Sequence, residues 1–560
     1  MYKGFFYFLL LCGCLFLSCS DQTDDVKIEA KGGKVYGGTI SYESLELVDH
    51  FFPLTATSMY EQRAISPIFE TLIEYNEGSK TLSGNLISSY AVSSDMKTID
   101  LDVRKGIYFH EDPCFKGRKE ALTASDVKFT LDFACSAHKL NKQSHLLTGK
   151  IKGAKDFYNS FDGDFSKGVE GIQELSDYSL RIELSYPNPT FIKMLTHQSI
   201  SVFSKKAFDY YKENIIHHPV GTGPFQLASS DKSERRYLRN NNYWKYDEHN
   251  NQLPFLDEIH VKQGMKKDAF SSFTSQQTDL LLAVPANKIN SLFGTLDEAK
   301  KGKNILHKLQ YRKGLKINYI GFDCGRPPFD DLQLRKALFH AVNRELICRD
   351  VLNGETNPAQ NGILPEGQYF SPTIKQKNPY SMSLAKYHMR KSRYKGDSIL
   401  FFISENAKSQ TNWCKQLVKE LKNSLGIKIK VITGTYAEKS LSIQRGESKM
   451  WLGAYVPDYP DGESYLSPYY SLNVGTSLRA LGQFKNTVFD QTFEMYSQEV
   501  DELKRNDYLN SCIQIMNSEA PVVPIYFENL LVVYNLNLRD ANMNSFGIMN
   551  FSKAYLKPVI

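Results

Sequence analysis

The chain has 560 residues, of which 41% are hydrophobic and 23% charged, a balance typical of a globular protein rather than a disordered one. Its 35 glycines and 21 prolines are too few for a collagen-like or low-complexity chain. The formal net charge of +6 is spread along the whole length, whereas a nucleic-acid-binding protein concentrates positive charge on one face, so we expect no nucleic-acid partner.

The N-terminus has the pattern of an export signal. One cation, Lys3, precedes an apolar segment from Phe5 to Leu17, which is shorter than the roughly 20 residues that span a bilayer. Cys19 follows a small residue at the end of this segment and resembles a bacterial lipoprotein cleavage site, although Phe16 replaces the usual leucine. We therefore predict a lipoprotein-type signal peptide over 1–18 and lipid attachment at Cys19. The alternative is an ordinary signal peptide with incidental cysteines.

Three segments further along the chain predict regular elements. Thr123–Asp126 is close to a capping box, and Val127, Leu131 and Ala134 follow at helical spacing. A second helix is expected after Pro327-Pro328-Phe329. Its N-cap is Asp330 or Asp331, its end is Gly354, and its predicted buried residues are Leu334, Leu338, Ala341, Val342 and Ile347. Apolar residues 399–403, a helical pattern of Trp413, Leu417, Leu421 and Leu425 stopped by Gly426, and alternating residues 427–432 predict a βαβ unit. The fold class is therefore α/β with parallel strands.

Six cysteines lie beyond the signal segment, at positions 114, 135, 324, 348, 414 and 512. An exported protein can form disulfides, but six cysteines allow 15 pairings and the sequence does not choose among them. Isolated buried thiols are the alternative. None of the six shows the C-x-x-C spacing of a zinc or redox site.

Motifs for catalysis are missing from the sequence, including those of nucleophilic hydrolases, zinc peptidases and phosphate-binding loops. Gly221-Thr222-Gly223-Pro224 begins like a dinucleotide fingerprint, but Gln226 stands where the third glycine belongs, so we expect a turn. His217 and His218 are adjacent and face two directions, which disfavours a metal site. We expect no catalytic residue, no metal and no cofactor, and this absence points toward binding.

Five segments, in order along the chain, resemble the extracytoplasmic solute-binding proteins of peptide ABC transporters, the oligopeptide/dipeptide-binding family. They cover essentially the whole chain after the signal. Gly462 replaces the family's proline after the last of them. The segments are Val103–His110 with Leu122–Val127, Pro219–Phe225, Asn242–Trp244 with Leu253–Ile259, Pro328–Asp331 with Leu334–Leu338 and Ala341–Glu345, and Pro457–Asp461.

The resemblance implies a binding site between two α/β lobes, where the peptide lies as an added strand. An aspartate of the last motif meets the ligand's ammonium group in relatives, and it matches Asp458, with Tyr455, Pro457 and Tyr459 beside it. Tyr455 stands where the family has tryptophan. The resemblance places the opposite wall of the cleft at Thr39–Ser44, where Tyr42, Glu43 and Ser44 would contact the ligand. The alternative for Asp458 is a turn residue before Tyr459-Pro460.

The resemblance also implies the domain layout. Lobe I would comprise 19–65, 200–284 and 525–560, an accessory domain on it 66–199, and lobe II 285–524. Crossovers near Val284-Pro285 and Pro521–Pro524 would form the hinge.

These features predict a monomeric, non-enzymatic receptor of the bacterial periplasm or cell envelope, held to a membrane by its lipid. It would capture oligopeptides and pass them to an inner-membrane ABC permease complex. Two alternatives stay open: the same fold binding a non-peptide solute such as a metal chelate, haem, glutathione or a sugar, and a cell-envelope hydrolase whose catalytic residues come from distant positions.

Overall fold

The structure, a computed structural model, describes residues 28–557 with several internal gaps. The signal peptide over 1–18 and Cys19 lie outside the described residues, as does Pro285 of the predicted hinge. The gaps are 264–268, 283, 285–287, 289–290, 293–297, 299–300, 302–306, 353–355, 367–378, 405–407 and 474–481.

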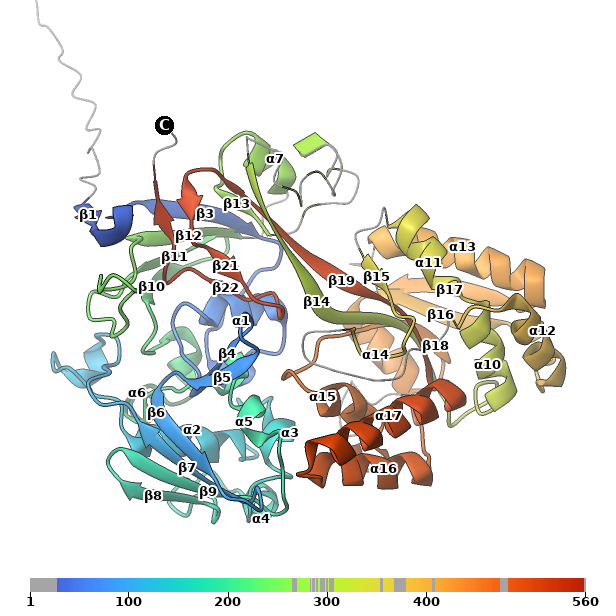
Figure 1. Ribbon diagram of the computed structural model, residues 1–560, viewed down its shortest axis with the longest axis horizontal. Coiled ribbons are helices and arrows are strands. Elements are labelled where there is room, and N and C mark those ends of the chain that lie inside the picture. Colours follow the sequence, from blue (N-terminus) through green and yellow to red (C-terminus); the bar gives the residue numbers. More distant parts are fainter. Residues whose placement is uncertain are drawn as a thin grey trace, which may run out of the picture.

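A single mixed sheet of 11 strands runs through the described part of the molecule (Figure 1). β3 pairs in parallel with β12 and β13, and β16 pairs in parallel with β17 and β18, whereas the central pairs are antiparallel. The strands in spatial order are β10 (Phe225–Ser230), β11 (Glu234–Arg239), β12 (Glu258–Gln263), β3 (Thr39–Ser44), β13 (Leu280–Leu281), β19 (Val522–Asn535), β14 (His307–Phe322), β18 (Met450–Tyr455), β16 (Ile399–Ser404) and β17 (Ile429–Gly434), with β15 (Thr356–Pro358) beside β19.

Two long strands join the two halves of this sheet. We call lobe I the part built on β10, β11, β12, β3 and β13, and lobe II the part built on β18, β16 and β17. β19 pairs with β13 at its C-terminal end, and β14 pairs with β18 at its C-terminal end. The chain therefore passes between the lobes within β14 and β19, which lie side by side (Figure 1). The predicted hinge residues Val522–Pro524 are the first residues of β19, paired with β14 next to lobe II.

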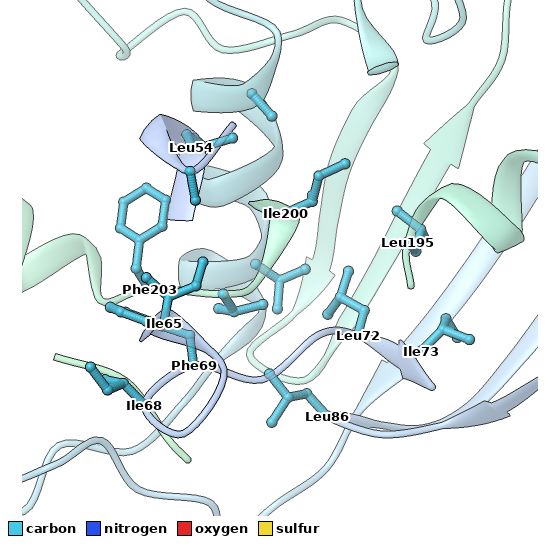
Figure 2. Close-up of a cluster of buried hydrophobic side chains, with 14 of the residues drawn as sticks. Leu54, Ile65, Ile68, Phe69, Leu72, Ile73, Leu86, Leu195, Ile200 and Phe203 are labelled. Carbon is cyan, nitrogen blue, oxygen red and sulfur yellow. The ribbon is translucent and has the colours of Figure 1, made fainter. Parts of the chain in front are cut away.

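A smaller antiparallel sheet lies at the lower left of Figure 1, and we call the part of the chain built on it the accessory domain. Its helix α2 begins with the predicted capping box, in which Thr123 and Asp126 each bond the other's backbone. Phenylalanine and aliphatic side chains of this domain share one continuous core with lobe I, part of which Figure 2 shows. The elements are β6 (Ile87–Val92), β7 (Thr98–Val103), β9 (Ser179–Glu183) and β8 (Ile172–Ser176), with α2 (Ala124–Ala134), α3 (Ser144–Leu147), α4 (Ala154–Ser160) and α5 (Phe191–Met194).

Helices cover the sheet of lobe II, and the predicted βαβ unit is confirmed there. β16 and β17 pair in parallel, and α13 between them ends just before Gly426, which adopts a positive φ of 69°. Trp413, Leu417 and Leu421 face the core from this helix. The helices of lobe II are α10 (Leu332–Ala341), α11 (Arg344–Leu346), α12 (Met382–Lys391), α13 (Lys408–Leu425), α14 (Tyr436–Gln444), α15 (Gly462–Leu466), α16 (Thr487–Gln498) and α17 (Glu502–Glu519).

The predicted helix after Asp331 is shorter than expected. Asp331 caps α10 by accepting a hydrogen bond from the N–H of Gln333 at 2.9 Å, but the helix ends at Ala341. Asn343 then caps α11 by accepting from the N–H of Leu346, so the chain turns there. The prediction of one helix reaching Gly354 is wrong. The side chains predicted to be buried, Leu334, Leu338, Ala341, Val342 and Ile347, are all buried.

Short elements complete the described chain. The hairpin β21–β22 and helix α1 matter most for function, because both border the cavity described below. The short elements are β1 (Ile28–Ala30) with β2 (Lys34–Tyr36), β4 (Ile73–Asn76) with β5 (Thr81–Gly84), β20 (Leu538–Arg539) with β23 (Tyr555–Leu556), β21 (Asn542–Met543) with β22 (Met549–Asn550), α1 (Met59–Ile65), α6 (Lys205–Tyr211) and α7 (Ala269–Thr274).

The six cysteines beyond the signal segment are all free thiols, four of them buried, so the alternative of isolated thiols is the one observed. Burial is also the main reason why the pKa of Cys324 is raised to about 12. Among the described residues, no helix combines the length and apolar character needed to cross a membrane.

Candidate functional site

A cavity of 250 Å³ lies between lobe II and the face formed by lobe I and the accessory domain. Three segments that are far apart in sequence surround it: the start of α1, the residues after α5, and the loop that follows β18. The β21–β22 turn and the first residue of α14 complete the wall. The lining residues are Thr57, Met59, Gln62, Thr196, His197, Gln198, Tyr436, Ala454, Tyr455, Val456, Pro457, Asp458, Asn544, Phe546 and Ile548.

Asp458 is the carboxylate of this cavity, and only 8% of the residue is exposed. Its backbone N–H donates to Ser464 Oγ at 2.7 Å, which ties the loop after β18 to α15. Tyr455 Oη lies 3.3 Å from Asp458 Oδ2 and 2.8 Å from the carbonyl oxygen of Ser464, to which it donates. These bonds hold the carboxylate at a fixed position on the lobe II side.

Two histidines of the accessory side face Asp458. His145 Nε2 in α3 lies 3.6 Å from Asp458 Oδ2, and His197 Nε2 lies 3.8 Å from Oδ1. His197 Nδ1 accepts the N–H of Ser199 at 3.2 Å and thereby caps the turn Gln198–Ile200. A neutral His197 must therefore carry its proton on Nε2, directed at Asp458.

This arrangement is suited to holding a cation. A carboxylate enclosed between two protein surfaces experiences a lower effective dielectric than water, so a charge-assisted bond to an ammonium group is strengthened there. Among the described residues, the wall of this cavity contains no serine or cysteine.

A second polar cluster also joins the accessory side to lobe II, away from the cavity. Lys193 Nζ lies 2.8 Å from Asp461 Oδ2, Thr190 Oγ1 donates to Glu463, and Lys150 Nζ lies 4.0 Å from Glu463 Oε1. We call these five residues the interlobe clamp.

Asp461 of the clamp is braced from within lobe II. Arg505 lies 2.8 Å from its Oδ1, and Tyr496 Oη donates to the same oxygen at 2.6 Å. Burial alone would raise the pKa of Asp461, but Lys193 and Arg505 outweigh it and lower the pKa far below its usual range. Asp461 therefore stays ionised and keeps its bonds at any physiological pH.

A larger cavity of 620 Å³ adjoins the first one and shares five wall residues with it: Thr196, Gln198, Asn544, Phe546 and Ile548. Glu70, Glu74 and Glu77 lie along this second cavity. The hollow beside Asp458 therefore continues under the β21–β22 hairpin.

The predicted site residues fall into two groups. Tyr455, Pro457 and Asp458 line the 250 Å³ cavity together. Tyr459 does not line it: its ring is 4% exposed and belongs to the core that lobe I shares with the accessory domain, and burial raises its pKa well above the usual value.

The predicted opposite wall lies in β3, where Tyr42, Glu43 and Ser44 are all buried. Tyr42 stacks on Phe551 with ring centroids 6.0 Å apart, and Ser44 Oγ donates to the carbonyl oxygen of Glu46. None of the three lines the cavity beside Asp458, so the structure does not bring the two predicted walls together there.

Sequence reasoning missed His145, His197 and the residues of the interlobe clamp. His145 and His197 lie more than 260 positions before Asp458, and no short motif marks them. Asp461 was within a quoted motif but was given no role. Only the folded chain identifies these residues.

The side chains relevant to a metal site are clusters of metal-ligating groups and the two adjacent histidines. Among the described residues, no group of three or more histidine, cysteine, aspartate or glutamate side chains could hold a metal ion. His217 contacts the carbonyl oxygen of Asp49 at 3.1 Å, and the His218 ring stacks on Tyr211.

Comparison with known proteins gives consistent matches over most of the chain. The family model described as bacterial extracellular solute-binding proteins, family 5 middle, matches residues 81–477. Di/tripeptide-binding protein 1 of Pseudomonas aeruginosa is 24% identical over 499 residues, covering 87% of this chain and 88% of that protein. Heme-binding protein A of Haemophilus influenzae is 25% identical over 472 residues, covering 82% and 81%.

Solved structures share the fold. The periplasmic binding protein DppA of Helicobacter pylori, in complex with the peptide STSA, has a TM-score of 0.75 at 19% identity. The match covers 93% of this chain and 99% of that one. The predicted two-lobed α/β architecture is thereby confirmed.

Proposed function

This chain belongs to the bacterial extracellular solute-binding proteins, family 5, and from that premise we propose that it captures peptides with a free amino terminus between its two lobes. Members of the family are the solute-binding components of ABC transporters and are not enzymes. The observation that carries the peptide proposal is Asp458, a buried carboxylate on the wall of the interlobe cavity. An α-ammonium group is the cation that such a carboxylate suits in a peptide.

The other predicted properties extend this proposal. An inner-membrane ABC permease would receive the peptide, and lipid at Cys19 would hold the monomeric receptor at the membrane of the cell envelope. The domain boundaries predicted from the sequence remain part of the proposal. Closing of the lobes around the ligand would be absorbed by β14 and β19, because these two strands pair with each other and link β13 of lobe I to β18 of lobe II.

The test pairs one variant with one modified ligand. Asp458→Ala leaves the ligand's ammonium buried without its partner, which costs roughly 2–5 kcal/mol, or about 30-fold to several thousand-fold in affinity. N-acetylation of the peptide removes the same charge from the ligand side. Calorimetry on the four combinations should therefore show that acetylation weakens binding strongly in the wild type and only slightly in the variant.

The matched control is Asp507→Ala, which removes an exposed carboxylate of α17 and should leave affinity unchanged. If mutation and acetylation weaken binding additively, Asp458 does not hold the amine and returns to the role of a turn residue.

A non-peptide solute is the second candidate, favoured by the match to Heme-binding protein A at 25% identity. The cavity beside Asp458 has a volume of 250 Å³, which is small for haem, a planar macrocycle. The adjoining cavity of 620 Å³ would have to accept it. Peptides remain our first proposal because Asp458 has a direct role only for a cationic ligand.

A further inference from the structure

The accessory face opposite Asp458 carries two imidazoles at ion-pair distance from its carboxylate, at 3.6 Å and 3.8 Å. We infer that His145 and His197 are part of the amino-terminal subsite, and that in their protonated forms they compete with the ligand's ammonium for Asp458. The inference rests on the proposed function and adds to it the residues that face the ligand's charge, together with the pH range in which binding is tight.

Protonated imidazoles would weaken binding because they carry the same charge as the ligand's ammonium group and lie close to it in a confined space. Imidazoles that meet both oxygens of Asp458 at these distances lie within a few ångströms of any ammonium bound to that carboxylate. A protonated imidazole would neutralise Asp458 and repel the incoming cation, and both effects are strong where water is excluded. A neutral imidazole does neither. The neutral His197 still directs its Nε2–H at Asp458 and helps to keep the carboxylate in place.

The other titratable groups around this site do not replace the histidines as the source of the effect. Tyr455 at the end of β18 and Tyr459 in the loop that follows it carry phenols, which are neutral when protonated and so do not become cations as the pH falls. Burial also raises the pKa of Tyr459 well above its usual value. Asp461 stays ionised, as shown above. Glu463 contacts Lys150 and Thr190 in the clamp rather than Asp458.

The direction follows from linkage. If the ligand binds only when an imidazole is neutral, binding releases the proton of that imidazole, and affinity falls as the pH decreases. Lowering the pH from 7.5 to 5.5 favours the protonated form of each imidazole, so it should weaken the binding of the ligand's ammonium group. The ligand's α-ammonium, with a pKa near 8, stays mostly protonated over the same range.

The experiment is calorimetry with trialanine and N-acetyl-trialanine, which have no titrating side chains, between pH 7.5 and 5.5. For wild type, trialanine should bind about tenfold more weakly at pH 5.5 than at pH 7.5, and its binding at pH 6 should release protons, as counted in two buffers of different ionisation enthalpy. N-acetyl-trialanine should bind weakly and without this pH dependence, because it carries no ammonium group.

The variants keep the local structure while removing the titration. His145→Gln preserves a polar group at the position of Nε2, and His197→Asn preserves an acceptor at the position of Nδ1, so the cap on Ser199 survives. The double variant should bind trialanine with an affinity that differs less than about twofold between the two pH values. His249→Gln, remote from the cavity, should behave as wild type.

The outcomes separate the two proposals. Trialanine that binds wild type with equal affinity at both pH values and without proton release overturns the role of the histidines while peptide binding stands. A pH dependence that persists unchanged in the double variant also overturns it. If peptides do not bind wild type at any pH, the proposed function itself fails, and this inference fails with it.

Discussion

At the scale of single residues, His50 shows how local charge contributes to stability. Its Nε2 lies 3.1 Å from Glu61 Oε1 and its Nδ1 lies 3.0 Å from Asp49 Oδ1. Glu61 also closes the capping box of α1 by accepting from the N–H of Ser58 at 2.7 Å. The bond to Glu61, supported by Asp49, outweighs burial and raises the pKa of His50 to about 9.

A histidine whose pKa is raised in the folded state stabilises the fold while it is charged. The contribution of His50 is complete below its ordinary pKa of 6.5 and is lost as the pH rises through about 9. Because the side chain is partly exposed, solvent screening reduces the effect to about 1 kcal/mol. Urea unfolding of His50→Gln should show that deficit at pH 6 and little deficit at pH 10. A deficit that is equal at both pH values would contradict this account.

The residues of the site itself were only partly predictable. Of the motif Pro457–Asp461, Pro457 and Asp458 lie on the cavity wall, because a short loop after a strand keeps neighbouring residues together. It could not distinguish Tyr459, which turns into the core, from Tyr455, which faces the cavity. His145 and His197 reach the site only through the packing of a separate domain, for which sequence spacing contains no signal.

At the scale of elements, Glu70 connects two of the sequence motifs in space. Its buried carboxylate accepts hydrogen bonds from Thr222, Tyr243 and Trp244 at 2.9–3.0 Å. Burial raises the pKa of Glu70, and these bonds oppose that rise. Hydrogen bonds to Glu70 thus hold the Gly-Thr-Gly-Pro loop and the Tyr-Trp segment in place, and both segments have a structural role here. For the loop, this agrees with the turn that the sequence predicts.

The glycines of that loop allow it to pack on the preceding segment. A Cβ on Gly221 would lie 2.0 Å from the carbonyl oxygen of Ile68, a backbone atom that cannot move aside alone. Gly221→Ala should therefore lower the free energy of unfolding by roughly 1–3 kcal/mol, measured as a lower urea midpoint. Gly149→Ala is the matched control, because no atom lies within 4 Å of its added Cβ. Two variants with the same midpoint would show that the close approach has no cost.

Elements with strong local signals were predicted well from the sequence. The capping box at Thr123 and the βαβ unit around α13 are both present, because their caps and periodicity come from neighbouring residues. The helix after Asp331 was extended too far, since buried apolar residues continue past Ala341 while Asn343 starts a new helix. Apolar spacing alone does not reveal that break.

At the scale of the whole molecule, two layers of polar contacts hold lobe II against the accessory domain. One is Asp458 with His197 on the cavity wall and His145 beside them, and the other is the interlobe clamp. The clamp residues do not line the cavity, so they can favour the closed arrangement without touching a ligand. A ligand that also bonds Asp458 adds its own contacts to both lobes, which makes binding and closing one event.

The central claim is that the cavity between the lobes holds peptides, and mass spectrometry of the retained ligand tests it most directly. The purified protein is exposed to a peptide digest of cell extract, washed, and then denatured to release what it holds. We expect short peptides with free amino termini, retained by the wild type and largely lost by Asp458→Ala. Release of haem, a sugar or a metal chelate instead of peptides, or equal retention of N-acetylated peptides, would contradict the account.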